Sequence, residues 1–359
     1  MSPRTRTIGS SNPEYVNARV RARRAALFDE EEYRKLVRMG PSEIARFMEE
    51  TEYETEINAL GARHSGVDLI EYALHANLAK HFDDLLDWAE GRLYEFIANY
   101  LRKFDAWNVK TVIRGIYAGA GQETIEADLI RAGEFSDREI DRLLEARSIE
   151  EVVDQLDGTI FGDPLEAAYE DYEATDTLVP LENAVDRTYY EHILDNVGSV
   201  SAERDDPVSQ YVEFLQAEID FRNARNALRL ARTGADIDPG EYFIEGGTLF
   251  DRREMSGLVA NREELLARIE ESTYGDRLDE ALVELRQAEN ESLIAFEHAL
   301  DIALSEYADR LANRYPMTIA SVLSYILAKE REVDNIRAIA RGREAGLSEE
   351  EIEEELVIL

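Results

Sequence analysis

The chain has 359 residues, with 40 lysines and arginines against 77 aspartates and glutamates, so its formal net charge is −37. This charge excludes most roles in nucleic-acid binding and disfavours anionic membrane surfaces, because both need a basic protein surface. An apolar content of 44% indicates a folded chain with its acidic residues at the surface, and the lack of cysteine excludes disulfides, thiol catalysis and thiolate metal sites.

The composition also indicates the setting in which the protein works. Only five of the 40 basic residues are lysines. Acid excess, few lysines and no cysteine favour a halophilic protein in a reducing compartment, because strong salt screens the repulsion between carboxylates. The alternative is an acidic protein from a mesophile. We expect neither secretion nor membrane insertion, since the sequence has no apolar signal segment and no stretch near ~18 apolar residues.

The chain begins with an expected disordered tail at residues 1–12, followed by one or two additional helices. Four arginines, Arg19, Arg21, Arg23 and Arg24, make this region an island of positive charge. The first helix either packs on the acidic body of the protein or presents a docking patch for an acidic partner.

Beyond this region apolar residues recur at helical spacing, as they do between Leu69 and Leu78. Ser136, Ser148 and Ser348 are each followed three residues later by glutamate, which is the pattern of a helix N-terminal capping box. Alternating strand patterns are hard to find. The sequence therefore predicts an all-α fold.

One motif occurs three times, with the pattern acid-x-x-Asn-x-base-x-x-x-Arg-x-x-x-x-Gly. The copies begin at Asp105, Asp220 and Glu332, which are 115 and 112 residues apart. Each copy is expected to be a helix that ends at its glycine, because glycine readily adopts the left-handed conformation of a helix C-cap. The asparagines and arginines of the three copies are Asn108 and Arg114, Asn223 and Arg229, and Asn335 and Arg341.

Other features precede each motif in the same order. Glu71, Glu182 and Glu297 stand 34 to 38 residues before the motif acids. A hydroxyl residue and an aromatic residue come still earlier, at residues 51–53, 159–161 and 272–274. We expect each recurring glutamate to accept hydrogen bonds from the recurring arginine inside its own repeat, as a buried structural brace between helices.

The spacing of these features divides the chain into repeats. Residues 13–128 are predicted to hold the N-terminal helix and the first helical repeat domain. The second and third repeat domains are predicted at residues 129–242 and 243–359.

The sequence contains none of the common motifs for metal binding, phosphate binding or nucleophilic catalysis. No histidine follows a glutamate at the spacing of di-iron bundles, and zincin, phosphate-loop and Gly-x-Ser-x-Gly patterns are absent. We therefore expect no catalytic residues, no cofactor and no metal. An enzyme with an unrecognised site is the least favoured alternative.

Four segments resemble the C subunit of archaeal A-type ATP synthases, a relative of the vacuolar ATPase d subunit. They are Tyr15-x-x-Ala-Arg-Val-Arg21, Thr51-x-Tyr53, Ile244-Glu-Gly-Gly247 and Lys329-Glu-x-Glu-Val-x-Asn-Ile-Arg337. The resemblance extends over nearly the whole chain from Tyr15 onward. Lys110 departs from it by replacing the arginine in the first motif.

The resemblance implies a helical funnel of three pseudo-symmetric domains on the cytoplasmic side of the cell membrane. Such a protein is a non-catalytic rotor part that links a central shaft of subunits D and F to the membrane proteolipid ring. It couples translocation of protons or sodium ions to ATP synthesis or hydrolysis, without a cofactor and without entering the membrane. The alternative function is a stand-alone acidic helical scaffold that recruits soluble protein partners.

Overall fold

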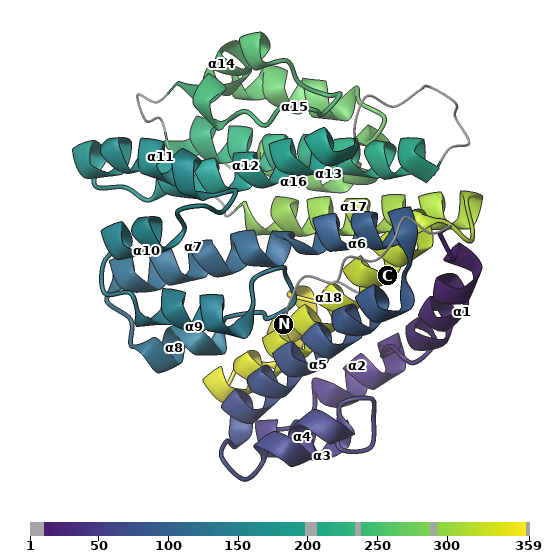
Figure 1. The fold of residues 1–359 in the computed structure, drawn as a ribbon. Helices are drawn as coiled ribbons and strands as arrows, with labels where there is room; N and C mark the ends of the chain where they lie inside the picture. The colour runs from purple at the N-terminus through teal and green to yellow at the C-terminus, as the bar shows by residue number, and fades with distance from the viewer. Residues whose placement is uncertain (1–10, 198–206, 234–237, 288–292, 357–359) are drawn as a thin grey trace. The chain divides into compact units, whose positions relative to one another are not determined.

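The computed structural model describes residues 11–197, 207–233, 238–287 and 293–356. These residues form α-helices, one short 3₁₀ helix and connecting loops, with no strand among them (Figure 1). The predicted all-α class is therefore confirmed. Most of the tail expected at residues 1–12 lies outside the described residues.

The chain divides into two compact units. The first unit contains Met1–Gly162 and Met317–Ile358, and the second contains Asp163–Pro316. The division into three repeat domains, with boundaries at residues 128 and 242, stays a prediction.

The helices of the first unit come from both ends of the chain. They are α1 (Pro13–Arg24), α2 (Glu30–Leu36), α3 (Pro41–Met48), α4 (Glu54–Leu60), α5 (Gly66–Trp88), α6 (Gly91–Leu101), α7 (Lys103–Ala118), α8 (Gln122–Ala127), α9 (Asp137–Glu145), α10 (Ile149–Gln155), α18 (Ile319–Ala345) and α19 (Glu349–Glu354).

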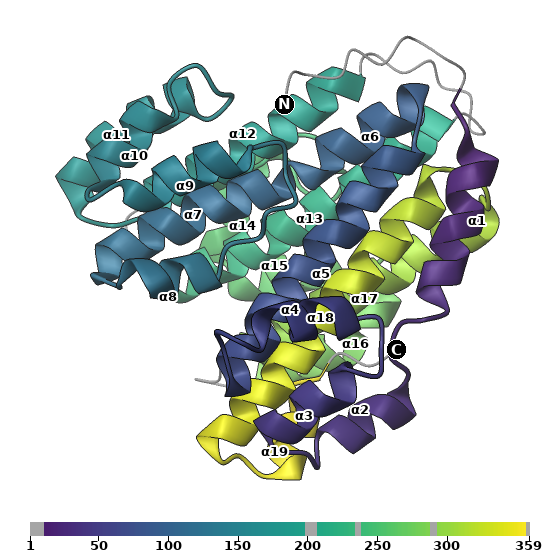
Figure 2. The ribbon, with the colours of Figure 1, turned by 60° about the horizontal axis from the view of Figure 1, so that its bottom comes forward.

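The long helix α18 is the centre of this unit. It packs along α5 and also contacts α1, α2, α3 and α6 (Figures 1 and 2). Apolar side chains such as Leu74, Leu78, Val322 and Ile326 are almost completely buried. The C-terminal part of the chain thus completes the core that the N-terminal helices begin.

Several helix ends have the structure that the sequence predicts. Ser136 and Ser348 each form a complete capping box with the glutamate three residues later. The motif helices α7 and α18 end at Gly119 and Gly346, whose φ angles are 67° and 78°. The corresponding glycine of the second motif, Gly234, lies outside the described residues.

The helices of the second unit are continuous in sequence. They are α11 (Gly162–Thr175), α12 (Val179–Val197), α13 (Pro207–Thr233), the 3₁₀ helix η1 (Pro239–Tyr242), α14 (Arg252–Ala260), α15 (Arg262–Glu270), α16 (Gly275–Gln287) and α17 (Ile294–Arg314).

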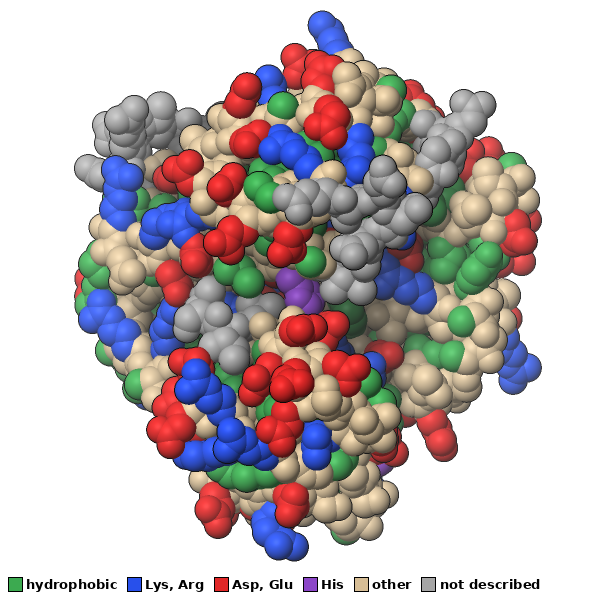
Figure 3. All heavy atoms as spheres, turned by 180° about the vertical axis from the view of Figure 1, so that it is seen from behind, with side chains coloured by type: hydrophobic (Ala, Val, Ile, Leu, Met, Phe, Trp, Pro, Cys, Tyr) green, Lys and Arg blue, Asp and Glu red, His purple; other side chains and the backbone are tan. Residues whose placement is uncertain are grey.

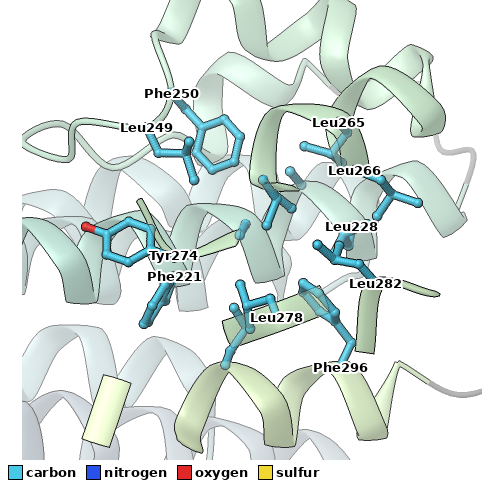
Figure 4. Packing of buried hydrophobic residues seen from close by; sticks show 14 of the residues in the cluster. Phe221, Leu228, Leu249, Phe250, Leu265, Leu266, Tyr274, Leu278, Leu282 and Phe296 are labelled. Atoms are coloured by element: carbon cyan, nitrogen blue, oxygen red, sulfur yellow. The ribbon is translucent and has the colours of Figure 1, made fainter. Parts of the chain in front are cut away.

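A hydrophobic cluster of α13, α14, α15, α16, α17 and the loop before α14 forms the core of this unit. Its side chains point toward one another in Figure 4, where Phe221, Leu265, Leu278 and Phe296 come from four different helices. Burial of such large apolar groups is the main stabilising contribution to a small core.

Acidic residues lie mostly at the surface. Figure 3 shows carboxylates spread over one face of the molecule, with basic side chains between them. Over the described ranges, no helix is long and apolar enough to cross a membrane.

Candidate functional site

The acid and the asparagine of the repeated motif are buried in all three copies. Their exposed fractions do not exceed 3%. Buried polar groups need hydrogen-bond partners, so the partners of these side chains show what the motif does. The six residues are Asp105, Asn108, Asp220, Asn223, Glu332 and Asn335.

In the first copy, Asn108 and Asp105 hold the loop that follows α8. The Asn108 amide donates to the carbonyl of Ile130 at 2.8 Å and accepts from its N–H at 2.9 Å. Asp105 accepts from the backbone N–H groups of Glu134 and Phe135, at 2.7 and 3.1 Å. We call this arrangement of acid, asparagine and loop a latch.

The second copy has the same latch. Asn223 exchanges two hydrogen bonds with the backbone of Ile244, at 2.9 and 3.0 Å. Asp220 accepts from the N–H groups of Thr248 and Leu249, at 2.7 and 2.8 Å. It also accepts from the hydroxyls of Thr248 and Tyr274.

Glycine occupies the position before the latched N–H groups in both loops. A Cβ atom on Gly133 or Gly247 would lie inside van der Waals contact with the carboxylate of Asp105 or Asp220. The backbone can therefore approach the acid only without a side chain at this position. These two glycines lie outside the repeated motif, but their nearly equal spacing of 28 and 27 residues after the acids is a signal that the sequence contains.

The third copy closes its latch with residues from the start of the chain. Glu332 accepts from the backbone N–H of Phe28 at 2.6 Å and from the Tyr53 hydroxyl at 2.6 Å. Lys329 donates to Glu332 and to the Tyr53 hydroxyl, at 2.7 and 2.8 Å. Burial lowers the pKa of Lys329, and the carboxylate of Glu332 opposes this effect.

This cluster fixes α18 relative to the N-terminal helices. The Lys329 and Glu332 side chains are 1% and 3% exposed. Such a pair adds little net stability, but removing one partner leaves the other charge buried and unpaired. Burial and the charge of Glu332 also raise the pKa of Tyr53 well above its ordinary value.

The hydroxyl residues that precede the aromatic residues form the same turn three times. In each turn the hydroxyl donates to the carbonyl three residues earlier, at 2.6 to 2.8 Å, and accepts from the N–H two residues later. The following aromatic residue differs, being Tyr53, Phe161 or Tyr274. Both tyrosines reach a motif acid, whereas Phe161 packs edge-on against Phe135.

Two of the recurring arginines pair with recurring glutamates. Arg229 donates to both carboxylate oxygens of Glu297 at 2.7 Å, and Arg341 donates to Glu71 and, at 3.3 Å, to Asp128. Burial alone would raise the pKa of Glu297, but the hydrogen bonds and the positive charge of Arg229 outweigh burial, so the pKa is lowered.

The expected burial and pairing inside one repeat are wrong for these two arginines. The side chains of Arg229 and Arg341 are 55% and 52% exposed. Each contacts the glutamate of a different repeat, because α13 packs on α17 and α18 packs on α5. Arg114 is exposed near the end of α7, and Glu182 is partly buried in the first turn of α12.

The four N-terminal arginines have different surroundings. Arg23 forms an ion pair with Asp84 at 2.5 Å, and Arg24 donates to the Ser324 hydroxyl. Arg19 and Arg21 are exposed. Two of the four are thus bound within the first unit, and two face solvent.

The described residues contain no group of three histidine or carboxylate side chains that could hold a metal ion. Two histidines are buried on α5. Burial is the main cause that lowers the pKa of His75 to about 4 and that of His81 to about 2, and His81 lies 2.6 Å from the Tyr325 hydroxyl. The contact between His81 and Tyr325 joins α5 to α18.

Comparison with known proteins gives the family. The model of the family described as ATP synthase (C/AC39) subunit matches residues 16–355. The chain is 68% identical to the C subunit of the A-type ATP synthase of Haloferax volcanii, over 98% of this chain and 99% of the relative. Identity is 60% with the protein of that name from Halobacterium salinarum and 33% with that from Methanosarcina mazei, with coverage of at least 94% of each chain. The chain therefore belongs to the ATP synthase (C/AC39) subunit family.

Proposed function

We propose that this chain is a non-catalytic rotor subunit of an A-type ATP synthase. It joins the central shaft of subunits D and F to the membrane proteolipid ring, so that translocation of protons or sodium ions is coupled to ATP synthesis or hydrolysis. The observation that carries the proposal is the match, over nearly their full length, to relatives named as the C subunit of an A-type ATP synthase.

The latches support a mechanical role. A part that transmits torque must keep its helices in register, and hydrogen bonds between a buried side chain and a neighbouring loop serve that need. Two of the motif copies have the same latch, and the third has its own version through Phe28 and Tyr53. We propose that the recurring Asn, Arg and Glu residues are structural braces of this kind. The funnel arrangement of three domains is part of the same proposal.

The proposed location is the cytoplasmic side of the cell membrane, as a peripheral part of the complex. The chain would be held there by contacts with protein subunits, because its net charge of −37 disfavours direct binding to anionic lipid.

Reconstitution tests the proposal. The purified chain should hydrolyse no ATP and should bind the D–F pair stoichiometrically, through an interface of at least about 1,000 Å². In membranes without this chain, ATP hydrolysis by the catalytic head should persist while ion pumping is lost. Pumping that stays fully coupled without the chain would contradict the proposal. A stand-alone scaffold would purify with neither the shaft nor the ring.

A further inference from the structure

Helix α1 is held firmly on the first unit. Asn12 donates to the carbonyl of Trp88 at 2.8 Å and accepts from the N–H of Glu90 at 2.9 Å. Asn17 is buried and donates to the carbonyl of Thr318 at 3.3 Å. The solvent face of α1 is therefore a preorganised surface, which loses little entropy when a partner binds.

Two guanidinium groups on this face have no acidic partner within the part of the chain that the structure describes. Arg19 and Arg21 are both exposed, and neither forms an ion pair with any carboxylate of the described residues. The helix has four arginines and one glutamate, Glu14, in a chain whose net charge is −37. Helix α1 thus carries unpaired positive charge, whereas the chain as a whole has a large excess of negative charge.

Arg19 is also oriented by aromatic rings. Its guanidinium carbon lies 4.7 Å from the centroid of the Tyr15 ring and 4.9 Å from that of Trp88. Tyr15 is itself 49% exposed. Contact with ring faces leaves the N–H edge of a guanidinium free, and that edge matches the two oxygens of a carboxylate.

We infer that Tyr15, Arg19 and Arg21 form a docking surface for an acidic segment of a protein partner in the ATP synthase. Arg19 donates to the principal carboxylate in a bidentate pair, and Arg21, which is two residues further along the helix and therefore on the opposite flank of its solvent face, binds a second acid. Tyr15, one turn before Arg19, supplies the apolar contact beside it, in keeping with the enrichment of tyrosine and arginine at the energetic centres of interfaces. The inference rests on the proposed function, because the partner is another protein of that complex.

A protein partner fits this surface better than a lipid surface. Lipid recognition uses clusters of roughly four to eight basic residues, and strong salt weakens such diffuse attraction. Only two arginines of α1 face solvent, which is fewer than such a cluster needs. A directly bonded and stacked ion pair is less sensitive to salt than a diffuse layer of charge.

Site-directed crosslinking identifies the occupant. The chain has no cysteine, so Ala22→Cys, on the same helix as Arg19 and Arg21, gives one attachment point for a benzophenone maleimide. In the purified, detergent-solubilised ATP synthase, the label should capture a peptide of another protein that is rich in aspartate and glutamate. Capture of lipid or of a peptide without acidic residues, or no capture although the chain is in the complex, would overturn the inference.

Charge reversal measures the contribution of the two arginines. Arg19→Glu with Arg21→Glu should weaken retention of the chain in the complex by about tenfold or more, as expected for loss of interface ion pairs. Arg63→Glu reverses another exposed arginine of the first unit and should change retention less than about twofold. Circular dichroism of both variants checks that they remain folded.

The two proposals fail in different ways. If the wild-type chain does not co-purify with the ATP synthase, the proposed function is wrong and this inference is wrong with it. If the wild-type chain co-purifies and the double reversal is retained equally well, only the docking surface is wrong.

Discussion

Asp105 and Asp220 occupy the same position in their latches, but they have different hydrogen-bond donors. Asp220 accepts from two backbone N–H groups and from the hydroxyls of Thr248 and Tyr274. Asp105 accepts from two backbone N–H groups, because Phe161 stands where the second copy has its tyrosine. Burial raises the pKa of Asp105 to about 7, although these N–H groups and Arg102 favour the ionised form.

This pKa makes a testable contribution to the pH dependence of stability. The folded chain binds the Asp105 proton more tightly than the unfolded chain, where the ordinary value is 3.8. Stability from this group is therefore greatest at low pH, falls as the pH rises from about 4 to about 7, and is constant above that. The fall amounts to at most about 4 to 5 kcal/mol at roughly 1.4 kcal/mol per pKa unit. In Asp105→Asn, the free energy of unfolding measured with denaturant should therefore fall less between about pH 4 and pH 7 than in the wild type. An equal fall in both proteins would show that Asp105 is not the group responsible.

The two recurring ion pairs should differ in their effect on stability. Arg341→Ala leaves the Glu71 carboxylate, whose side chain is 7% exposed, without its arginine, and should cost about 1 to 3 kcal/mol. Arg229→Ala is the matched control, because Glu297 is 22% exposed and can be hydrated, so its cost should stay below about 1 kcal/mol. Both variants are compared by denaturant unfolding at the same salt concentration. Equal losses of unfolding free energy would show that burial of the glutamate does not determine how much its arginine contributes to stability.

At the scale of helices and loops, each motif helix is joined to a loop of its own unit by hydrogen bonds to the loop backbone. Helix α7 holds residues 130–135, α13 holds residues 244–249, and α18 holds Phe28. The first two loops come one short helix after their motif helices. The third motif lies near the end of the chain, so its latch uses a residue from the beginning.

The loop backbone at Gly247 lies so close to the Asp220 carboxylate that a larger side chain at position 247 should destabilise the fold. Gly247→Ala should destabilise the second unit by about 1 to 3 kcal/mol, because the new methyl group meets the Asp220 carboxylate. Gly257→Ala is the control in the same unit, since a Cβ there meets no atom within 4 Å. It lies inside α14 and should be neutral or stabilising by up to about 1 kcal/mol. Thermal unfolding of both variants distinguishes a blocked approach from a general intolerance of alanine.

At the scale of the whole molecule, net charge determines how stability depends on salt. Repulsion among the carboxylates of a chain with a charge of −37 opposes the folded state in dilute buffer. The melting temperature should therefore rise between about 0.01 M and 1 M salt, as the screening length falls from about 30 to about 3 Å. A melting temperature that is independent of salt would contradict the halophilic interpretation. The high identity to haloarchaeal relatives is consistent with that interpretation.

The sequence by itself determined what depends on local chemistry and on repetition. Helical periodicity, the caps at Ser136 and Ser348, and the helix ends at Gly119 and Gly346 could all be predicted, because each depends on residues within one or two turns. Comparison of the three motifs also selected the acids and asparagines that the structure buries.

Only the tertiary structure decided the partners of these residues. Glu332 meets Phe28 and Tyr53 across 304 and 279 positions of sequence, and Arg341 meets Glu71 across 270. Sequence spacing places an arginine on a helix, but helix packing decides which glutamate faces it and how much water reaches the pair. The arginines of α1 show the same limit: Arg23 and Arg24 face α5 and α18, whereas Arg19 and Arg21 face solvent, and this difference arises only when α1 packs on the folded unit.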